Sequence, residues 1–180
     1  VVWWDESHAK EILVADMDAN GTDELYVVKE GHVVMEGGKK KLKDPVTLVR
    51  MDTKNGKKWK ETTVATLEGD PQTRFVVPGD VDGDGQLEIV AAGMDTGLWV
   101  LQPKGDGTFT PELVDKNSGG FEHATHVADL DGDGKLEIYV ASDKQRQLRS
   151  YTWDGTKWNR KKIADFPKSH ITWNVQDGVF

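Results

Sequence analysis

The chain has 180 residues and a formal net charge of −8, from 23 basic and 31 acidic side chains. A single domain of this length buries roughly 70% of the surface that its unfolded chain exposes, so a full hydrophobic core is expected. The acidic balance argues against a nucleic-acid partner, and no apolar run is long enough to span a membrane as a helix. The absence of Cys excludes disulfides, thiolate zinc sites and cysteine nucleophiles.

The first predicted unit covers residues 10–66. Short β-branched runs predict strands at 11–15, 24–28, 47–50 and 59–66. An insertion at 29–45 contains the tract Gly37-Gly38-Lys39-Lys40-Lys41, which indicates an exposed loop, and residues 32–35 could add a short strand. This tract could contact an anionic partner, although a solvated loop is the simpler interpretation.

Two further units follow the same order, at residues 73–114 and 123–164. Each is predicted to have four strands, and the last two strands of every unit are joined by a Gly-containing turn. These turns, Asn55-Gly56, Asp106-Gly107 and Asp154-Gly155, predict type I′ hairpins. Each is followed by an aromatic residue for which we expect a packing role between units. The three aromatic residues are Trp59, Phe109 and Trp158.

An acidic nonapeptide joins the first two predicted strands of every unit. Oxygen-bearing side chains stand at its positions 1, 3, 5 and 9, with Gly at position 6. Ca²⁺ takes 6–8 oxygen ligands in a flexible shell, and Gly permits the tight reversal of the backbone around an ion. The pattern predicts two to three Ca²⁺ ions. The candidate ligands are Asp16, Asp18, Asn20 and Glu24; Asp80, Asp82, Asp84 and Glu88; and Asp129, Asp131, Asp133 and Glu137.

An EF-hand loop begins in the same way but needs a Glu at position 12 and helices on both sides. Position 12 is Val27, Ala91 and Val140 in the three copies, and the flanking sequences indicate strands. The remaining alternative is a plain acidic β-turn that holds no ion. Three copies in one register favour metal loops that each join two strands.

The nonapeptides begin at residues 16, 80 and 129, at spacings of 64 and 49 residues. A unit of this length is typical of a four-stranded propeller blade. We therefore predict an all-β fold, a β-propeller with three complete blades. Residues 1–9 are expected to end a preceding blade and residues 169–180 to start a following one. Three blades cannot close a ring. Either a longer chain or further copies must complete it, and we favour the former.

These strand–DxDxDGxxE–strand units resemble the FG-GAP/VCBS repeat family of calcium-loop propellers. The resemblance is strong at 80–88 and 129–137 and weaker at 16–24, where Asn20 replaces an acid. It implies that the residues named above hold the metal. It also implies that the backbone carbonyls at position 7 join them, and these belong to Thr22, Gln86 and Lys135. Weak calcium loops fill where Ca²⁺ is about millimolar, so an extracytoplasmic location, secreted or periplasmic, is expected.

The remaining candidates for chemistry are less regular. His8, His123 and His170 stand near the starts of inner strands and could converge on a transition metal or an anion; with His126, they could equally hydrogen-bond to neighbouring loops. No catalytic motif is present, so no catalytic residue is predicted. We expect a binding or scaffolding module whose partner is a protein or further blades. The alternatives are a lectin-like propeller that stacks glycans on Trp, or a non-catalytic part of a polysaccharide-active enzyme.

Overall fold

The computed structural model describes residues 8–121, 123–168 and 172–176, and every regular element in these ranges is a β-strand. The predicted all-β class is confirmed. In chain order the strands are β1 (Ala9–Ala15), β2 (Glu24–Lys29), β3 (His32–Glu36), β4 (Lys39–Asp44), β5 (Val46–Thr53), β6 (Trp59–Leu67), β7 (Thr73–Gly79), β8 (Glu88–Gly93), β9 (Leu98–Pro103), β10 (Phe109–Asp115), β11 (Thr125–Ala128), β12 (Glu137–Ser142), β13 (Gln147–Trp153) and β14 (Trp158–Asp165).

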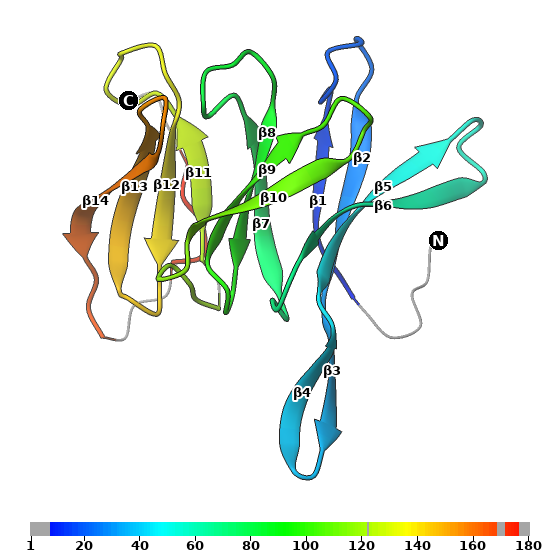
Figure 1. Ribbon diagram of the computed structural model, residues 1–180, viewed down its shortest axis with the longest axis horizontal. Coiled ribbons are helices and arrows are strands. Elements are labelled where there is room, and N and C mark those ends of the chain that lie inside the picture. Colours follow the sequence, from blue (N-terminus) through cyan, green and yellow to red (C-terminus); the bar gives the residue numbers. More distant parts are fainter. Residues whose placement is uncertain (1–7, 122, 169–171, 177–180) are drawn as a thin grey trace.

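Three antiparallel four-stranded sheets follow one another along the chain (Figure 1). Blade 1 has the order β1-β2-β5-β6, blade 2 consists of β7 to β10 and blade 3 of β11 to β14. The first strands of the blades, β1, β7 and β11, lie next to one another. The sheets fan out from these strands and do not close into a ring, as expected for an incomplete propeller.

Blade 2 packs through both of its faces. Ile89 of β8 lies in one core cluster with Tyr26 of β2, between blades 1 and 2. Ile138 of β12 lies in a second cluster with Val90 of β8, between blades 2 and 3. Successive strand residues point to opposite faces of a sheet. One face of a blade therefore meets the preceding blade and the other face meets the following blade.

Blade 1 has an open apolar face on the side away from blade 2. By the same alternation Leu25 and Val27, the equivalents of Ile89 and Ala91, lie on this face. They pair with Val14 and Ile12 of β1, whose side chains are 56% and 60% exposed. No described strand covers these two side chains, so a hydrophobic surface of the blade-packing type is left open to solvent.

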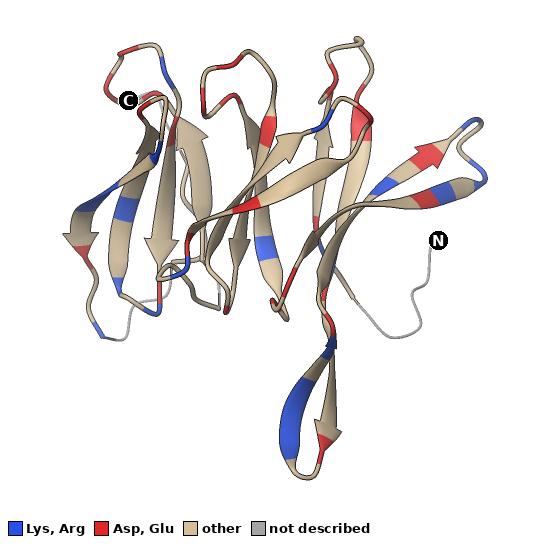
Figure 2. Cartoon of the chain, viewed as in Figure 1, with Lys and Arg blue, Asp and Glu red and all other residues tan. Residues whose placement is uncertain are grey.

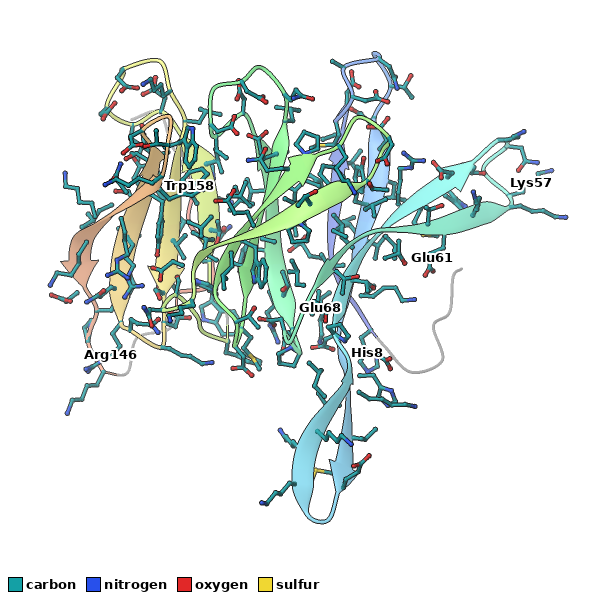
Figure 3. The ribbon with its side chains drawn as sticks, viewed as in Figure 1. His8, Lys57, Glu61, Glu68, Arg146 and Trp158 are labelled. Atoms are coloured by element: carbon teal, nitrogen blue, oxygen red, sulfur yellow. The ribbon has the colours of Figure 1, made fainter. Side chains whose placement is uncertain are left out.

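The three aromatic residues that follow the Gly-containing turns do not share one environment. Phe109 is buried, and its ring meets that of Tyr26 edge-on at a centroid distance of 6.0 Å. Trp158 packs against the cluster between blades 2 and 3 (Figure 3). Trp59 is 44% exposed, so the predicted packing role is wrong for this residue. The reason is that Phe109 and Trp158 pack toward a preceding blade, and no described strand occupies that place beside Trp59.

The insertion of blade 1 is a β-hairpin: the short strand expected at 32–35 is confirmed as β3, but the Gly/Lys tract is not the exposed loop that its composition indicated. β3 and β4 pair from Glu36 and Lys39 down to His32 and Asp44, and they form a separate two-stranded sheet. Both turn residues, Gly37 and Gly38, have positive φ values, of 57° and 78°. The Lys residues of the tract therefore belong to a strand, and the hairpin projects from the body of the protein (Figure 1).

The predicted hairpin turns between the last two strands of each blade lie where expected, but their type is wrong. The connections cover residues 54–58, 104–108 and 154–157, which is longer than the two residues of a type I′ turn. In each of them an Asx side chain accepts a hydrogen bond from the N–H two residues further on. The acceptors are Asn55, Asp106 and Asp154.

The predicted outer fragments of neighbouring blades fall largely outside the described residues, which is the case for 1–7, 169–171 and 177–180. The described stretch 172–176 contains no strand. Within the ranges that the structure describes, no helix has the length and hydropathy to cross a membrane.

Candidate metal centres

The three acidic nonapeptides lie at the same end of their blades, as the loops β1–β2, β7–β8 and β11–β12 (Figure 1). Figure 2 shows acidic residues gathered at these three loops. Each loop leaves an inner strand and returns as the next strand of the same sheet. The antiparallel register pairs the residue before each nonapeptide with its ninth residue, as Ala15–Glu24, Gly79–Glu88 and Ala128–Glu137, and so brings the two ends of the loop together.

Each loop is closed by a hydrogen bond between its second residue and its ninth. An Oε2 oxygen of Glu24, Glu88 or Glu137 accepts the backbone N–H of the residue at position 2, at 2.9, 2.9 and 3.2 Å. These Glu residues begin the second strands, so their side chains point back over the loop. The position-9 acid is thus oriented by the strand that the local sequence specifies.

A second set of bonds wraps each loop around its first residue. The carboxylates of Asp16, Asp80 and Asp129 accept the N–H of the position-6 Gly at 2.8, 3.1 and 2.9 Å. That Gly has a φ between 86° and 89° in all three loops, a left-handed conformation that only Gly adopts without strain. The position-3 acids each accept the N–H of position 5, at 3.1–3.2 Å.

Position 4 also needs a left-handed residue, which sequence reasoning missed. Gly83 and Gly132 occupy it with φ values of 76° and 74°. The first loop has Ala19 there, at a φ of 55°. A side chain in this region costs of order 1 kcal/mol. The first loop is therefore strained at Ala19 as well as lower in charge at position 5.

The carboxylates of each loop converge. One oxygen from every member of a group lies within 4.8 Å of those of the others. The groups are Asp16, Asp18 and Glu24; Asp80, Asp82 and Glu88; and Asp129, Asp131, Asp133 and Glu137.

The two remaining position-5 residues and the position-7 residues have other neighbours. Asp84 is not in its group, because its carboxylate accepts both the backbone N–H and the side-chain amide of Gln86, at 2.8 and 3.0 Å. The amide oxygen of Asn20 accepts the N–H of Thr22 at 2.9 Å. In all three loops the position-7 residue, Thr22, Gln86 or Lys135, therefore donates its N–H to position 5.

The second loop contains carboxylate oxygens that have no donor. Glu88 is fully buried, and its Oε1 and the Oδ1 of Asp80 have no hydrogen-bond partner among the described residues. Burial raises the pKa of Glu88 to about 7, and the nearby charges of Asp82, Asp84 and Asp80 act in the same direction. The hydrogen bond from Val81 opposes this shift. Buried anionic oxygens are costly unless paired with a cation, so the geometry suits a bound metal ion.

The donor set consists of carboxylate and amide oxygens on a loop, with no His or Cys in any group. Hard cations such as Ca²⁺ and Mg²⁺ prefer oxygen ligands, and Ca²⁺ tolerates irregular geometry better than Mg²⁺ does. A cation held there would keep the acids ionised. The clusters are therefore better suited to joining two strands through an ion than to proton transfer.

No His that the structure describes belongs to a converging group of metal-ligand side chains. His123 is buried between loops: its Nδ1 lies 2.9 Å from the carbonyl oxygen of Gly93, and its Nε2 lies 2.7 Å from Oγ of Ser118. This is the loop-bonding role that we weighed against a ligand site. His8 is exposed and His126 half-buried, at other places in the fold, and His170 lies outside the described residues.

Two acids that sequence reasoning did not single out connect the blades. Asp70 is fully buried and accepts hydrogen bonds from the β8–β9 loop, 24 to 26 residues further along the chain. Asp115 at the end of β10 accepts bonds from Tyr151 at 2.8 Å and from Arg149 and Arg160 of blade 3. No local pattern predicts these partners, because each belongs to another loop or blade.

The comparisons with known proteins agree with the repeat that the geometry shows. The family model of the FG-GAP-like repeat matches residues 16–91 and 80–140, which together contain all three acidic loops. No curated protein matches the chain. The match covers well over half of the sequence, and the chain belongs to the FG-GAP-like repeat family.

Proposed function

We propose that the chain is a calcium-stabilised propeller segment of an extracytoplasmic protein and acts as a binding or scaffolding module. The observation that carries the proposal is the convergence of carboxylates in three loops that share the same closing hydrogen bond from position 2 to position 9. The proposal is further supported by the second loop, in which buried Oδ1 of Asp80 and Oε1 of Glu88 accept no hydrogen bond from the described residues. The proposal assigns no reaction to the chain.

The proposed ligands are the side chains at positions 1, 3, 5 and 9 and the backbone carbonyls at position 7. Repulsion among these acids opposes folding without metal, so calcium binding should be coupled to stability. The first loop should bind most weakly, because Asn20 lowers its charge and Ala19 is strained. Loops of modest affinity fill where Ca²⁺ is abundant, which supports a location outside the cytosol. The proposed ligand set is Asp16, Asp18, Asn20, Thr22 and Glu24; Asp80, Asp82, Asp84, Gln86 and Glu88; and Asp129, Asp131, Asp133, Lys135 and Glu137.

Further blades are proposed as one partner. The open face of blade 1, with Ile12, Val14 and Trp59, repeats the surface through which blades 2 and 3 pack on their predecessors. Blade 3 exposes the opposite type of face, on which Tyr139 is the equivalent of Tyr26. The unit boundaries at 10–66, 73–114 and 123–164 are proposed on the same repeat.

The calcium proposal is tested by thermal unfolding in EDTA and in increasing Ca²⁺. Free ligand at a hundredfold excess over its Kd stabilises by about 2.7 kcal/mol per site. This corresponds to a rise in Tm of roughly 5–10 °C for a domain of this size. In Asp131→Asn, the rise in Tm on adding Ca²⁺ should be smaller by most of the contribution of the third loop. Asp44→Asn makes the same charge change on the hairpin, far from the loops, and should keep the full shift. Identical melting curves with and without Ca²⁺ contradict the proposal.

A second candidate function, glycan binding, is favoured by the exposure of Trp173, which is 69%. An exposed aromatic ring can stack on a sugar, although the exposure of Trp59 is already explained by the open blade face. Glycan-array binding that Trp173→Ala abolishes would support this candidate. An array with no Trp173-dependent signal would exclude it.

A further inference from the structure

Blade 1 carries the main departure from the repeat. Blades 2 and 3 join their second and third strands through the short loops 94–97 and 143–146, whereas blade 1 inserts the β3–β4 hairpin at this place. The four-stranded blade does not need the hairpin, since the other two blades form without one. In repeat proteins, insertions of this kind fall on one face of the fold, which is often the binding face.

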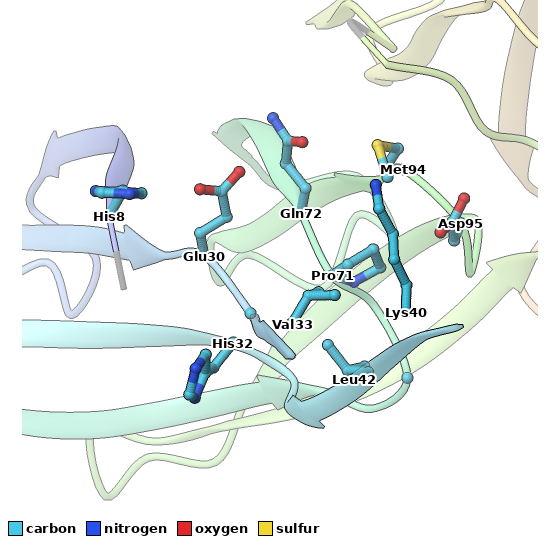
Figure 4. A pocket seen from close by; sticks show the side chains of 12 residues that line it. His8, Glu30, His32, Val33, Lys40, Leu42, Pro71, Gln72, Met94 and Asp95 are labelled. Carbon is cyan, nitrogen blue, oxygen red and sulfur yellow. The ribbon is translucent and has the colours of Figure 1, made fainter. Parts of the chain in front are cut away.

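A cleft of about 600 Å³ lies between the hairpin and the body of the protein (Figure 4). Val33, Lys40 and Leu42 line it from the hairpin, and Pro71 and Met94 line it from the turns of blades 1 and 2. It is at the end of the blades opposite the acidic loops (Figure 1). Its lining combines aliphatic side chains with polar ones, which include His8, His32 and Gln72, and no Phe, Tyr or Trp of the described residues lines it.

The cleft is held open by backbone contacts at the base of the hairpin. Gly31 N–H donates to the carbonyl of Pro71, and Val46 N–H donates to that of Asp70, both at 2.9 Å. A Cβ at Gly31 would stand 2.9 Å from the carbonyl oxygen of Asp44 and 3.0 Å from Cα of Pro71. This close approach requires Gly and fixes the hairpin relative to the β6–β7 turn, so the cleft exists before any ligand binds.

The uncompensated fixed charge of the cleft is positive. Its acids are paired: Glu30 lies 3.5 Å from Lys10, and Asp95 forms an ion pair with Lys144. Lys40 has no carboxylate within 4.0 Å among the described residues, and Figure 4 shows its side chain extending across the cleft toward Met94. An anionic group that entered the cleft would find an ammonium group without a competing partner.

The charge of the chain is segregated around this region (Figure 2). Residues 29–45 carry five Lys and three Asp or Glu, against eighteen Lys or Arg and 28 Asp or Glu in the rest of the chain. The surrounding negative field opposes the approach of a long polyanion such as nucleic acid. A short acidic segment that reaches only the hairpin does not meet that opposition.

We propose that the cleft beneath the β3–β4 hairpin binds a short, extended, acidic peptide segment of a partner protein. A carboxylate of the peptide pairs with Lys40, and an aliphatic side chain beside it packs on Val33, Leu42 and Met94. The two-stranded hairpin also has open edges, which offer main-chain hydrogen bonds to an extended segment. The inference rests on the proposed role as a binding module, but it does not depend on the calcium loops.

The test is fluorescence anisotropy with a labelled short peptide of alternating Glu and Val, alongside a Lys/Val peptide and a galacturonate oligomer. Lys40→Glu should weaken binding of the Glu/Val peptide about tenfold or more. Lys57→Glu is the matched control, because it makes the same charge change at the tip of the β5–β6 hairpin (Figure 3). The control should bind as the unaltered protein does. Raising salt from about 0.05 to 0.5 M should weaken the interaction through screening.

The proposal would be overturned if the Glu/Val peptide did not bind up to about 1 mM, or if Lys40→Glu and Lys57→Glu lost the same affinity for it. It would also be overturned if the Lys/Val peptide bound as tightly as the Glu/Val peptide, or if galacturonate were the only ligand whose binding depended on Lys40. Amide shifts on peptide addition should be confined to residues 8, 30–44, 69–72 and 94–95, and shifts elsewhere would also contradict the proposal. The titrations are run in Ca²⁺ and in EDTA with melting curves alongside, so failure of the peptide site is distinguished from failure of the calcium proposal.

Discussion

Replacement of Asp70 should strongly destabilise the folded state. Its carboxylate accepts the N–H of Gln72, Met94, Asp95 and Thr96 at 2.8–3.2 Å, and the Thr96 hydroxyl at 2.6 Å. It thereby joins the turn that ends blade 1 to the β8–β9 loop of blade 2. Gly93 leaves the space that the carboxylate needs, since a Cβ there would lie 2.3 Å from an Asp70 oxygen.

The magnitude follows from the donors that Asp70→Ala would leave behind. Hydrogen bonds to charged groups contribute about 1.5–3 kcal/mol each, and a buried donor without an acceptor costs a similar amount. The Gln72 N–H is buried and the others are partly buried, so water can compensate for some of them. We therefore expect Asp70→Ala to lower the free energy of unfolding by about 4 kcal/mol, which is well below the sum of five hydrogen bonds to a charged group.

Urea unfolding followed by Trp fluorescence measures this loss. With an m-value of about 2 kcal/mol/M, the midpoint should fall by roughly 2 M. Asp95→Ala is the control, because its side chain is 49% exposed and its ion pair with Lys144 is a surface one. It should shift the midpoint by less than about 0.3 M. Both measurements are repeated in EDTA, where the difference should persist. If the urea midpoint of Asp70→Ala shifted by no more than that of Asp95→Ala, the proposed role of the Asp70 hydrogen bonds in stability would be refuted.

Two further predictions concern the contact between blades 2 and 3. Burial lowers the pKa of His123 to about 4, so the folded state resists protonation while an unfolded His accepts a proton near pH 6.5. The free energy of unfolding should fall by about 3 kcal/mol as pH drops from 7 to 4. In denaturant titrations at several pH values, the free energy of unfolding of His123→Asn should depend less steeply on pH than that of the unaltered protein. An equal dependence on pH in the two proteins would contradict this role of His123. Asp115→Ala should cost about 3 kcal/mol, because it leaves Arg149 buried without its carboxylate. Arg160→Ala should cost less than about 1 kcal/mol, since that partner is 48% exposed, and a larger cost than for Asp115→Ala would reverse this assignment.

The local parts of the fold were open to sequence reasoning. Alternation of apolar residues has a period of two in strands, and Asp, Asn and Gly have specific turn chemistry, so the blades and the acidic loops could be predicted. The convergence of Asp129, Asp131, Asp133 and Glu137 follows from one loop and the two strands beside it. Even here, the turn between the last two strands was assigned the wrong type, because an Asx side chain and not a two-residue turn reverses the chain.

Features that depend on a neighbouring blade could not be predicted. Trp59, Phe109 and Trp158 share one position in the repeat, yet Trp59 is exposed because its environment is decided by whether a blade lies beside it. In the insertion, the strand expected at 32–35 is confirmed, but the Lys tract that forms β4 was assigned to a loop because Lys is disfavoured in strands, and pairing with β3 overrides that propensity.

The amino-acid sequence alone determined the chemistry of the acidic loops, since each loop depends on residues within about nine positions of one another, and the recurrence of that pattern along the chain gave the repeat. Only the tertiary structure decided which acids join the blades and which aromatic rings are covered by a neighbouring blade. It also placed Lys40 in the lining of a preformed cleft. Contacts of this kind join segments separated by tens of residues. Their partners are set by how whole sheets stack, and a local pattern carries no information about that stacking.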